Sequence, residues 1–406
     1  MNIGFVSEAL PYLPSVGGFR LYGANLIRHL APRHQIDLVS LLTEDDHRHL
    51  AWAGQYCRSV QTIPVKDAGL VPRLANLAST YGWGRPLHPR QEIASALERG
   101  LRERRWDVLH VEGAYAGALV DPRLRVAKVL SAHDSRTLRS MEMQACATTI
   151  REKAYHRLLR FVQPRYERLV YPRFDCCVFV APRDVQAARD VAPGIRTALI
   201  ANGVDTEHFH PMSVPKESAT LVFHGHLGYL PNVAAAVDFA DSVLPLVRRQ
   251  VPEAIFHMVG ADPHPRVTAL RSRPGIRVSA NLPDLRPAVC SGSVYVCAVR
   301  HGTGVKNKLL EAMAMRLPIV STPGAVAGIE VVPGTHLLAA DDPPTFAGHI
   351  VGLLREPCAA ERLAAAGRRL VEERYSWSSR AQDFERLYEG VIRERHAGRV
   401  PSASRS

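Results

Sequence analysis

The chain lacks the sequence signals of export and of membrane insertion. Its first residues, Met1 to Val6, contain no basic segment and no long apolar run, and Glu8 and Pro11 follow at once. This start excludes an ordinary signal peptide. No unbroken stretch approaches the roughly 20 apolar residues that are needed to cross a bilayer. We therefore expect a cytoplasmic protein without a membrane-spanning helix.

Cys-x-x-Cys pairs and metal-ligand patterns are also missing. The seven cysteines are scattered, and Cys176, Cys177 and Cys297 lie within apolar, strand-like runs, so we expect reduced thiols in the core. The sequence contains no Asp-x-Asp after a strand and no cluster of His, Cys and Asp with ligand spacing. It therefore calls for no metal ion.

Acidic residues are too few to balance the basic ones. The chain has 51 Lys and Arg against 39 Asp and Glu, a formal net charge of +12. This excess favours an anionic membrane surface, a nucleic acid or a phosphorylated substrate as partner. The basic residues are not interleaved with aromatic ones and form no recognition motif, so we expect no nucleic acid. For much of the excess, Arg on solvated helix faces is the simpler explanation.

Short apolar runs rich in β-branched residues alternate with longer helical patterns along the chain. This alternation predicts a parallel α/β architecture, and a length of 406 residues favours two domains. The predicted strands are residues 2–7, 36–42, 108–111, 126–131, 176–180 and 197–201 in the first half, and 220–224, 255–259, 276–278, 294–298, 318–321 and 336–339 in the second.

We expect two Rossmann-like, doubly wound domains that face each other across a cleft. The first is placed at residues 1–205 and the second at 206–380, because a polar, proline-containing stretch follows Asp205. Residues 381–406 are expected to form a final helix that packs back on the first domain, and then a disordered tail. Ligands of such sheets bind at the carboxyl ends of the strands.

Three loops at predicted strand ends carry the candidate site residues, and the first holds Gly17 and Gly18, before a helix predicted over residues 19–30. Glycines allow close backbone approach, and the amino end of the helix offers N–H groups to a phosphate. A plain turn explains the pair equally well. The motif is not Gly-x-Gly-x-x-Gly and no acidic residue ends the second strand, so a nicotinamide cofactor is disfavoured.

The second loop begins at His133, just past the predicted strand 126–131. A histidine at the carboxyl end of a strand can act as an acid, a base or a hydrogen-bond donor near neutral pH. Alternatively, His133 only caps the next helix together with Asp134. His110 is a competitor of the same type, but it lies within a predicted strand, with Glu112 nearer to the strand's end.

The third loop follows the predicted strand 294–298 and leads into a helix, which suits anion binding. Arg300 and Lys306 add positive charge to it. Its central turn consists of Gly302, Thr303 and Gly304. In the following helix, the Glu311 carboxylate could accept both hydroxyls of a ribose, and a surface salt bridge to Lys308 is the alternative.

The run from Gly304 to Ala314, with Pro318 to Pro323 after it, resembles the donor-site motif of the family 4 retaining glycosyltransferases of the GT-B fold. Further segments that look like this family, in the expected order, are residues 17–18, 202–205, 222–225 and 375–377. The resemblance implies an enzyme that moves a sugar from a nucleoside-diphosphate sugar to a glycan, lipid-linked or small-molecule acceptor, with retention at the anomeric carbon. Residues 1–205 would then be the acceptor side and residues 206–380 the donor side, with no cofactor beyond the nucleotide sugar.

Several residues match the family's site. Glu311 matches its ribose-binding Glu, and Gly17 and Gly18 match its diphosphate-side glycines. His133 matches the His that contacts the donor sugar near the reacting carbon. Gly225, in the segment that opens the second domain, is assigned to the donor site as well.

Other positions depart from the family. Thr303 stands where the family often has a second Glu, which holds a donor-sugar hydroxyl. His226 and Asn232 stand where the family often carries an Arg and a Lys. The altered motif, Gly-x-x-x-Lys-x-x-Glu-Ala-Met-Ala, looks like a subgroup linked to exopolysaccharide assembly.

The missing Arg and Lys shift the expected phosphate charge to the third loop. We expect Lys306 and Arg300 to neutralise the departing diphosphate. Lys308 should matter less, because two residues of separation in a helix turn the side chains about 200° apart.

Two other functions fit the same layout. A nucleotide-sugar 2-epimerase binds the same donors, but it needs several acidic and histidine groups that converge for proton abstraction. A binding protein that has lost catalysis is favoured by Thr303 and by the missing Arg and Lys. The acceptor is either soluble or lipid-linked, with basic helices lying on the anionic inner face of the membrane. The basic residues concerned are Arg139, Arg151, Lys153, Arg157, Arg160, Arg165 and Arg168.

Overall fold

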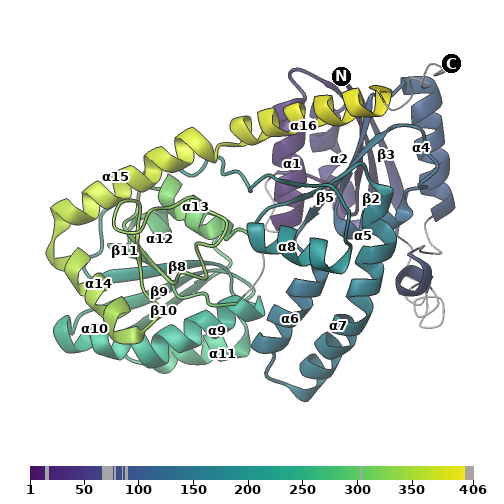
Figure 1. Ribbon diagram of the computed structural model, residues 1–406. Coiled ribbons are helices and arrows are strands. Elements are labelled where there is room, and N and C mark those ends of the chain that lie inside the picture. The colour runs from purple at the N-terminus through teal and green to yellow at the C-terminus, as the bar shows by residue number, and fades with distance from the viewer. Residues whose placement is uncertain are drawn as a thin grey trace, which may run out of the picture. The chain divides into compact units, whose positions relative to one another are not determined.

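Two parallel sheets, one in each half of the chain, organise the computed structural model (Figure 1). The structure describes residues 1–13, 18–65, 76, 79–84, 86, 90–301 and 304–397. The chain divides into two compact units. Unit 1 comprises Met1–Met141, Ala154–Ile200 and Arg380–Ser406, and unit 2 comprises Glu142–Lys153 and Ala201–Ser379.

The sheet of unit 1 has seven strands, all parallel, in the order β3-β2-β1-β4-β5-β6-β7. The strands are β1 Asn2–Ser7, β2 Gln35–Leu42, β3 Ser59–Pro64, β4 Val108–Glu112, β5 Ala127–His133, β6 Cys176–Phe179 and β7 Thr197–Leu199. Its central strands are buried apolar runs, because helices cover both faces of a parallel sheet. The sequence missed β3, since this edge strand buries only Ile63 fully and has no apolar run.

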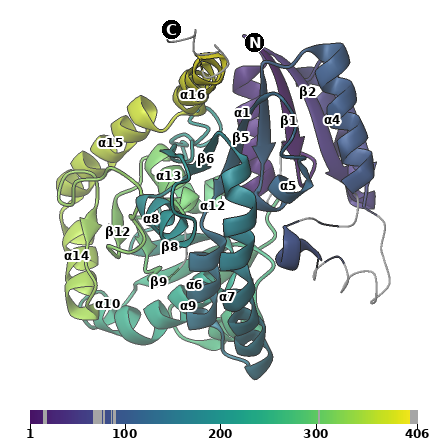
Figure 2. The ribbon, with the colours of Figure 1, turned by 45° about the vertical axis from the view of Figure 1, so that its right-hand side comes forward.

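Helices pack on this sheet along its whole width. The helices that lie wholly or mostly in unit 1 are α1 Gly18–Leu30, η1 Glu44–His49, α2 Leu50–Tyr56, α4 Arg90–Arg104, α5 Ala114–Leu119, α6 Arg136–Cys146, α7 Ile150–Val170, η2 Tyr171–Arg173, α8 Pro182–Val191 and α16 Trp377–Ala397. Helix α4 lies against β1, β2 and β3 (Figure 2). The core between them includes Trp106, whose indole Nε1 donates to Asp37 Oδ2 at 2.8 Å.

The final helix, α16, is fastened to unit 1 by polar contacts. Tyr388 Oη lies 2.7 Å from His110 Nδ1 in the core. At the surface, Arg33 Nε donates to Glu385 Oε1 at 2.7 Å, and Arg395 Nη1 donates to Asp175 Oδ1 at 2.8 Å. Residues 380–397 therefore complete the N-terminal sheet unit. The sequence predicts a disordered tail from about Arg393, but α16 continues to Ala397, and residues 398–406 lie outside the described residues.

The sheet of unit 2 has six parallel strands in the order β10-β9-β8-β11-β12-β13. They are β8 Thr220–His226, β9 Ile255–Ala261, β10 Ile276–Ala280, β11 Val294–Cys297, β12 Ile319–Ser321 and β13 Leu338–Ala339. Counted from its first strand, this order is 3-2-1-4-5-6, and the first six strands of unit 1 have the same order. Both sheets are thus doubly wound, as expected for Rossmann-like domains.

Helices cover both faces of the second sheet as well (Figure 1). They are α9 Leu230–Asp238, η3 Phe239–Val243, α10 Leu244–Gln250, α11 Pro265–Ala269, η4 Leu270–Ser272, α12 Arg286–Cys290, α13 Asn307–Ala314, α14 Pro343–Arg355 and α15 Pro357–Arg374. Among the described parts of the chain, one helical stretch, Leu230–Gln250, is long and apolar enough to span a membrane, and 56% of its most apolar window is buried. The search of the sequence for unbroken apolar runs did not detect this stretch, because polar residues interrupt it. Its apolar side chains, such as Phe239 and Val247, pack into the core of unit 2.

Gly260 provides a test of the strand packing that shapes the end of β8. It pairs with Gly225 across β8 and β9, and a Cβ at Gly260 would lie only 1.7 Å from the Gly225 carbonyl oxygen. Gly260→Ala must push backbone apart, so we expect it to lower the free energy of unfolding by about 1–3 kcal/mol or more. Urea denaturation measures this loss.

Gly348→Ala is the matched control. Gly348 lies within α14, where an added Cβ meets nothing within 4 Å. An alanine there should stabilise the helix by roughly 0.5–1 kcal/mol. Equal denaturation midpoints for the two variants would show that the Gly225–Gly260 contact is not close.

Candidate active site

The strand order places a switch point in each sheet, where the chain reverses its direction of winding. It lies between β1 and β4 in unit 1 and between β8 and β11 in unit 2. In doubly wound sheets, ligands bind beyond the carboxyl ends of the strands at this point. The candidate residues can therefore be compared with two defined places.

In unit 2, His224 and Gly225 lie near the end of β8, which is at His226, and beside helix α13. His224 Nε2 lies 2.7 Å from Glu311 Oε2. The imidazole is almost wholly buried, whereas 19% of the Glu311 side chain is exposed. The expected alternative partner of Glu311, Lys308, makes no ion pair with it among the described residues. Glu311 is therefore held in place by His224, with part of its carboxylate open to solvent.

Lys308 lies in the same place. Its ammonium Nζ donates to Asn232 Oδ1 and lies 4.5 Å from the centre of the Phe223 ring. Gly225 has a φ of +140°, and a Cβ on it would lie 3.1 Å from Lys308 Nζ. Burial lowers the pKa of Lys308 to about 8, and the nearby charge of Lys306 adds to this effect.

The expected separation of the two lysines is wrong. Helix α13 begins at Asn307, and Lys306 precedes it in an extended conformation with φ −82° and ψ 90°. The helical angle of about 200° therefore does not apply to Lys306 and Lys308. Lys306 Nζ donates to the Gly304 carbonyl at 3.3 Å. Burial raises the pKa of Cys297, at the end of β11, and the charges of both lysines partly oppose this rise.

The other predicted residues of this loop are only partly placed. The Arg300 guanidinium lies 3.5 Å from Asp238 Oδ2 and 3.3 Å from Asp341 Oδ1. Its assignment to a phosphate stays a prediction. Gly302 and Thr303 lie outside the described residues, as does Gly17 in unit 1.

In unit 1, β5 ends in His133, which has a φ of +65°. Its Nε2 lies 2.6 Å from Glu112 Oε1, at the end of β4. The ring packs edge-on against Tyr22, with the ring centres 4.4 Å apart. Burial alone would lower the pKa of His133, but the charge and hydrogen bond of Glu112 raise it above its ordinary value. His133 is therefore bound to a carboxylate, and its assignment to the donor sugar stays a prediction.

Glu112 joins two histidines. Its second oxygen, Oε2, lies 2.9 Å from His110 Nε2, and both side chains are fully buried. His110 in turn contacts Tyr388 of α16 and stacks on Phe5, with ring centres 4.5 Å apart. Burial alone would raise the pKa of Glu112, but His133 and His110 together lower it. His110 therefore supports the carboxylate from the core rather than facing a ligand.

Glu8 is a further carboxylate at this switch point that the sequence did not indicate. It follows β1, and its Oε2 accepts hydrogen bonds from the backbone N–H groups of Tyr115 (3.1 Å) and Ala116 (3.3 Å). Burial raises its pKa, and Arg136 opposes this only in part. Sequence reasoning missed Glu8, Glu112 and His224 because each depends on a contact between different strands or helices.

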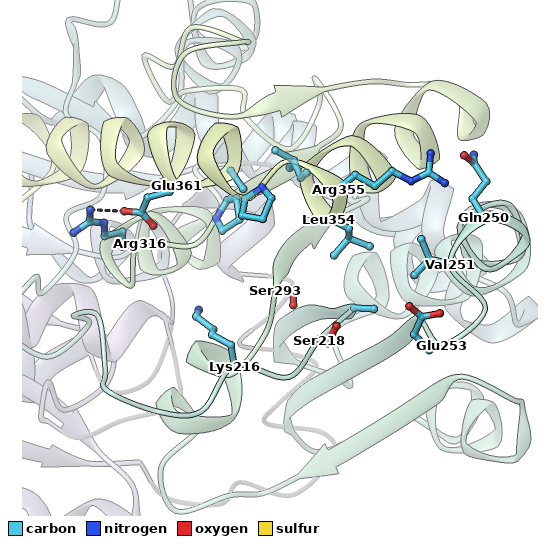
Figure 3. A pocket seen from close by; sticks show the side chains of 15 residues that line it. Lys216, Ser218, Gln250, Val251, Glu253, Ser293, Arg316, Leu354, Arg355 and Glu361 are labelled. Atoms are coloured by element: carbon cyan, nitrogen blue, oxygen red, sulfur yellow. Dashed lines mark ion pairs between the residues drawn. The ribbon is translucent and has the colours of Figure 1, made fainter.

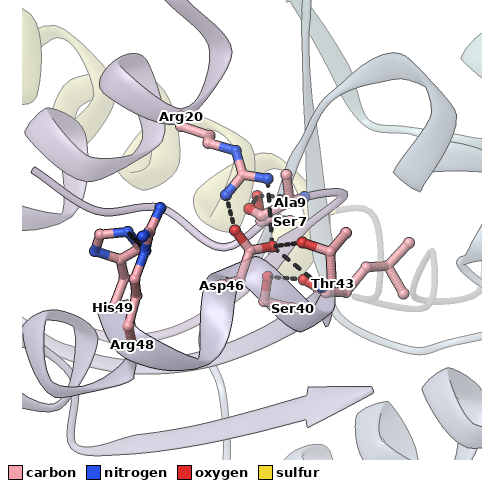
Figure 4. Close-up of polar contacts among 9 residues, drawn as sticks. Ser7, Ala9, Arg20, Ser40, Thr43, Asp46, Arg48 and His49 are labelled. Carbon is pink, nitrogen blue, oxygen red and sulfur yellow. Dashed lines mark hydrogen bonds and ion pairs between the residues drawn. The ribbon is translucent and has the colours of Figure 1, made fainter. Parts of the chain in front are cut away.

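Helix α1 begins at Gly18, an exposed position with nothing within 4 Å of an added Cβ. Two residues on, the Arg20 guanidinium is held by Asp46 of η1 (Figure 4). Asp46 Oδ2 also accepts from Thr43 Oγ1 at 2.7 Å. Because Asp46 is buried and neutralises Arg20, the first turn of α1 offers an anion its backbone rather than this side chain.

A cavity of about 480 Å³ in unit 2 lies elsewhere (Figure 3). Ser218 and Ser293 line it just before β8 and β11, so it is at the amino ends of the strands. Three of its charged groups are engaged, as Arg316 pairs with Glu361 and Lys216 Nζ donates to the Cys290 carbonyl at 2.8 Å. We therefore do not place the site there.

Two family models match the sequence. The Glycosyltransferase Family 4 model covers residues 16–208, and the Glycosyl transferases group 1 model covers residues 218–356. The chain belongs to the family 4 glycosyltransferases. The resemblance of its glycine-loop motif to that family is thus confirmed, and so is sugar transfer as the reaction of this enzyme.

Known proteins agree with this assignment. A phosphatidyl-myo-inositol mannosyltransferase of Mycobacterium leprae is 25% identical over 315 aligned positions, and the match covers 74% of this chain and 77% of the relative. Sucrose-phosphate synthase from Thermosynechococcus elongatus has a TM-score of 0.71 at 17% identity, over 97% of this chain and 99% of its own. Anabaena HepE, in complex with UDP and glucose, has a TM-score of 0.66 at 13% identity, over 96% and 100%. The two structural likenesses confirm the GT-B fold.

Glu112→Gln should lower the pKa of His133. The variant keeps the shape of the side chain but removes its charge, so burial then dominates and the pKa should fall below the ordinary value of 6.5. In the native glycosyltransferase the pKa is raised, so the stability gained from the charged pair is present below about pH 6.5 and is lost as the pH rises through the raised pKa. NMR titration of the His133 ring measures the shift directly.

Glu92→Gln is the control, because Glu92 is an exposed residue of α4. It should leave the titration of His133 unchanged. An equal His133 pKa in Glu112→Gln and in the native enzyme would mean that Glu112 does not hold the imidazolium.

Proposed function

We propose that this glycosyltransferase takes its sugar from a nucleoside-diphosphate sugar and transfers it with retention, without a metal ion or other cofactor. The acceptor is a glycan, a lipid-linked sugar or a small molecule. The observation that carries the proposal is the group at the carboxyl ends of β8 and β11, where Glu311, His224 and Lys308 lie together.

The nucleotide is proposed to bind unit 2 through Glu311. Its carboxylate is partly exposed and fixed by His224, so it can accept both hydroxyls of a ribose without first being ordered. Gly225 and Gly304 let the backbone approach the ligand, since both have a positive φ. The HepE structures, which hold UDP with glucose or UDP-glucose, support this class of donor.

Charge on the departing diphosphate is proposed to be met by cations and by backbone N–H groups. Lys306 lies just before α13, whose amino end adds its backbone N–H groups. These groups stabilise the negative charge that develops as the sugar–phosphate bond breaks. Arg300 is the second proposed cation. To bind the diphosphate, its guanidinium must exchange its contact with Asp341 for one with phosphate.

Retention is proposed to occur without a protein nucleophile. The acceptor hydroxyl attacks the anomeric carbon on the face that the diphosphate leaves, and its proton passes to a departing phosphate oxygen. Glu112 is engaged by two histidines and Glu8 by two backbone N–H groups, which leaves both carboxylates poorly suited to attack. His133, whose protonated form is favoured by Glu112, is proposed to donate a hydrogen bond to the donor sugar near the reacting carbon.

The enzyme is proposed to act in the cytoplasm and to bind reversibly to the inner face of the membrane. Helix α7 carries Arg157 and Arg160 together with exposed apolar side chains. The exposed fractions are 59% for Tyr155, 61% for Leu158 and 71% for Phe161. Basic and apolar side chains on one exposed helix favour an anionic lipid surface.

A panel of labelled nucleotide sugars, with and without acceptors, tests the proposed reaction. Transfer with retained anomeric configuration and no loss of activity in EDTA supports the proposal, whereas epimerisation of the donor or binding without turnover would replace it with another function.

His133→Ala should keep the donor affinity but lower turnover, because the proposed partner of His133 is the reacting sugar.

Glu311→Ala should weaken nucleotide-sugar binding more than it destabilises the fold. The ribose loses a charged acceptor, a loss of about 1.5–3 kcal/mol in binding free energy. Calorimetry on the folded variant measures it, with Glu372→Ala on the surface of α15 as control. Unchanged affinity in Glu311→Ala would remove this residue from the site.

Membrane binding should be driven by electrostatic attraction and should be reversible. Each Arg near an anionic surface contributes about 1 kcal/mol, so Arg157→Glu with Arg160→Glu should release the enzyme from anionic vesicles at low salt. Sedimentation measures this, with the exposed Arg362→Glu of unit 2 as control. Equal binding to neutral vesicles, or no binding to anionic ones, argues against a membrane location.

A further inference from the structure

A buried ammonium group in unit 2, that of Lys308, makes no ion pair with a carboxylate of any residue that the structure describes. Lys308 Nζ donates to the Asn232 side chain and lies over the ring of Phe223. Among the residues whose placement is described, no Asp or Glu oxygen lies within ion-pair distance of this atom. Burying a charge without a counter-ion is costly, so an anion that arrives at Lys308 is strongly favoured.

The ammonium is held in a fixed position. Asn232 Nδ2 donates to the His226 carbonyl at 2.8 Å, which turns Oδ1 of the same amide toward Lys308. Gly225 leaves room for the ammonium, because any larger residue would place its Cβ about 3.1 Å from Nζ. Of the three N–H groups of a lysine, the amide takes one and the ring faces another, which leaves a donor for a ligand oxygen.

A second cation strengthens the need for an anion. Burial lowers the pKa of Lys308 most, the charge of Lys306 lowers it further, and the charge of Glu311 raises it, so both groups lie near this ammonium. Glu311 is on the same helix, but its carboxylate is bound to His224. Two neighbouring like charges beside a ribose-binding carboxylate match the order of groups in a nucleoside diphosphate, in which phosphates follow the ribose.

We propose that Lys308, positioned by Asn232 and Gly225, binds the diphosphate of the donor through its second, sugar-bearing phosphate. This inference rests on the donor site proposed above and adds a residue to it. Lys308 then serves as the anchor for the leaving group, and Lys306 shares the charge from the loop. The negative charge that builds on the diphosphate during transfer strengthens the contact.

Binding of nucleoside diphosphates and monophosphates distinguishes this role. UDP, UMP, GDP and GMP are titrated calorimetrically into the native enzyme and into Lys308→Met, which keeps the length of the side chain. We expect the native enzyme to prefer the diphosphate of its base. Lys308→Met should lose roughly tenfold or more of the diphosphate affinity and keep its monophosphate affinity within about twofold.

Lys216→Met is the matched control. Lys216 is another lysine of unit 2, and its ammonium is bound by the carbonyls of Cys290 and Gly292, before β11. Its loss should leave both affinities unchanged. If Lys308→Met does not fold, Lys308→Gln keeps a hydrogen-bond donor for Asn232 and serves in the same titration.

The results separate this proposal from the one on which it rests. Equal losses of monophosphate and diphosphate affinity, or no loss at all, would show that Lys308 only supports the fold. A native enzyme that binds no nucleotide overturns the proposed donor site itself. A selective loss of the diphosphate preference supports both.

Discussion

The order of the strands is the constraint on which the other features depend. In each sheet the chain forms a central strand first, adds strands toward one edge, and then crosses back to add strands on the other side. As a result, β1 lies beside β4 and β8 lies beside β11. At these two pairs, the connections leave the carboxyl ends of neighbouring strands toward opposite faces of the sheet. Polar and charged residues that follow the strands can therefore gather there without being covered by a crossover helix.

The two units solve the problem of a buried charge in opposite ways. In unit 1, the Glu112 carboxylate is placed between His133 and His110, so its charge is neutralised within the fold. In unit 2, the Lys308 ammonium contacts a neutral amide and an aromatic ring, and within the described part of the chain it has no carboxylate at ion-pair distance. A compensated charge orients its partners, whereas an uncompensated one favours a ligand of opposite sign. The first arrangement suits the fixing of His133, and the second suits the binding of an anion.

Much of the fold follows from the sequence, because buried parallel strands are apolar on both faces and stand out as runs. The strand β3 escaped this signal, since it lies at an edge and buries little besides Ile63. His133 and Glu311 could be found because each lies just after a strand or within a recognisable motif. Their partners Glu112 and His224 could not, because a pairing between separate strands and helices leaves no local pattern.

The start of α13 shows why a correct motif can still give wrong geometry. Lys306 occupies the cap position without the Ser, Thr, Asp or Asn side chain that usually marks a helix start. Nothing local therefore distinguishes a helix that includes Lys306 from one that begins at Asn307. The difference of one residue changes the direction of the Lys306 side chain and brings its charge near that of Lys308. The same start leaves Glu311 in the second turn, where His224 holds its carboxylate, so the position of Glu311 follows from this contact rather than from an assumed helical register.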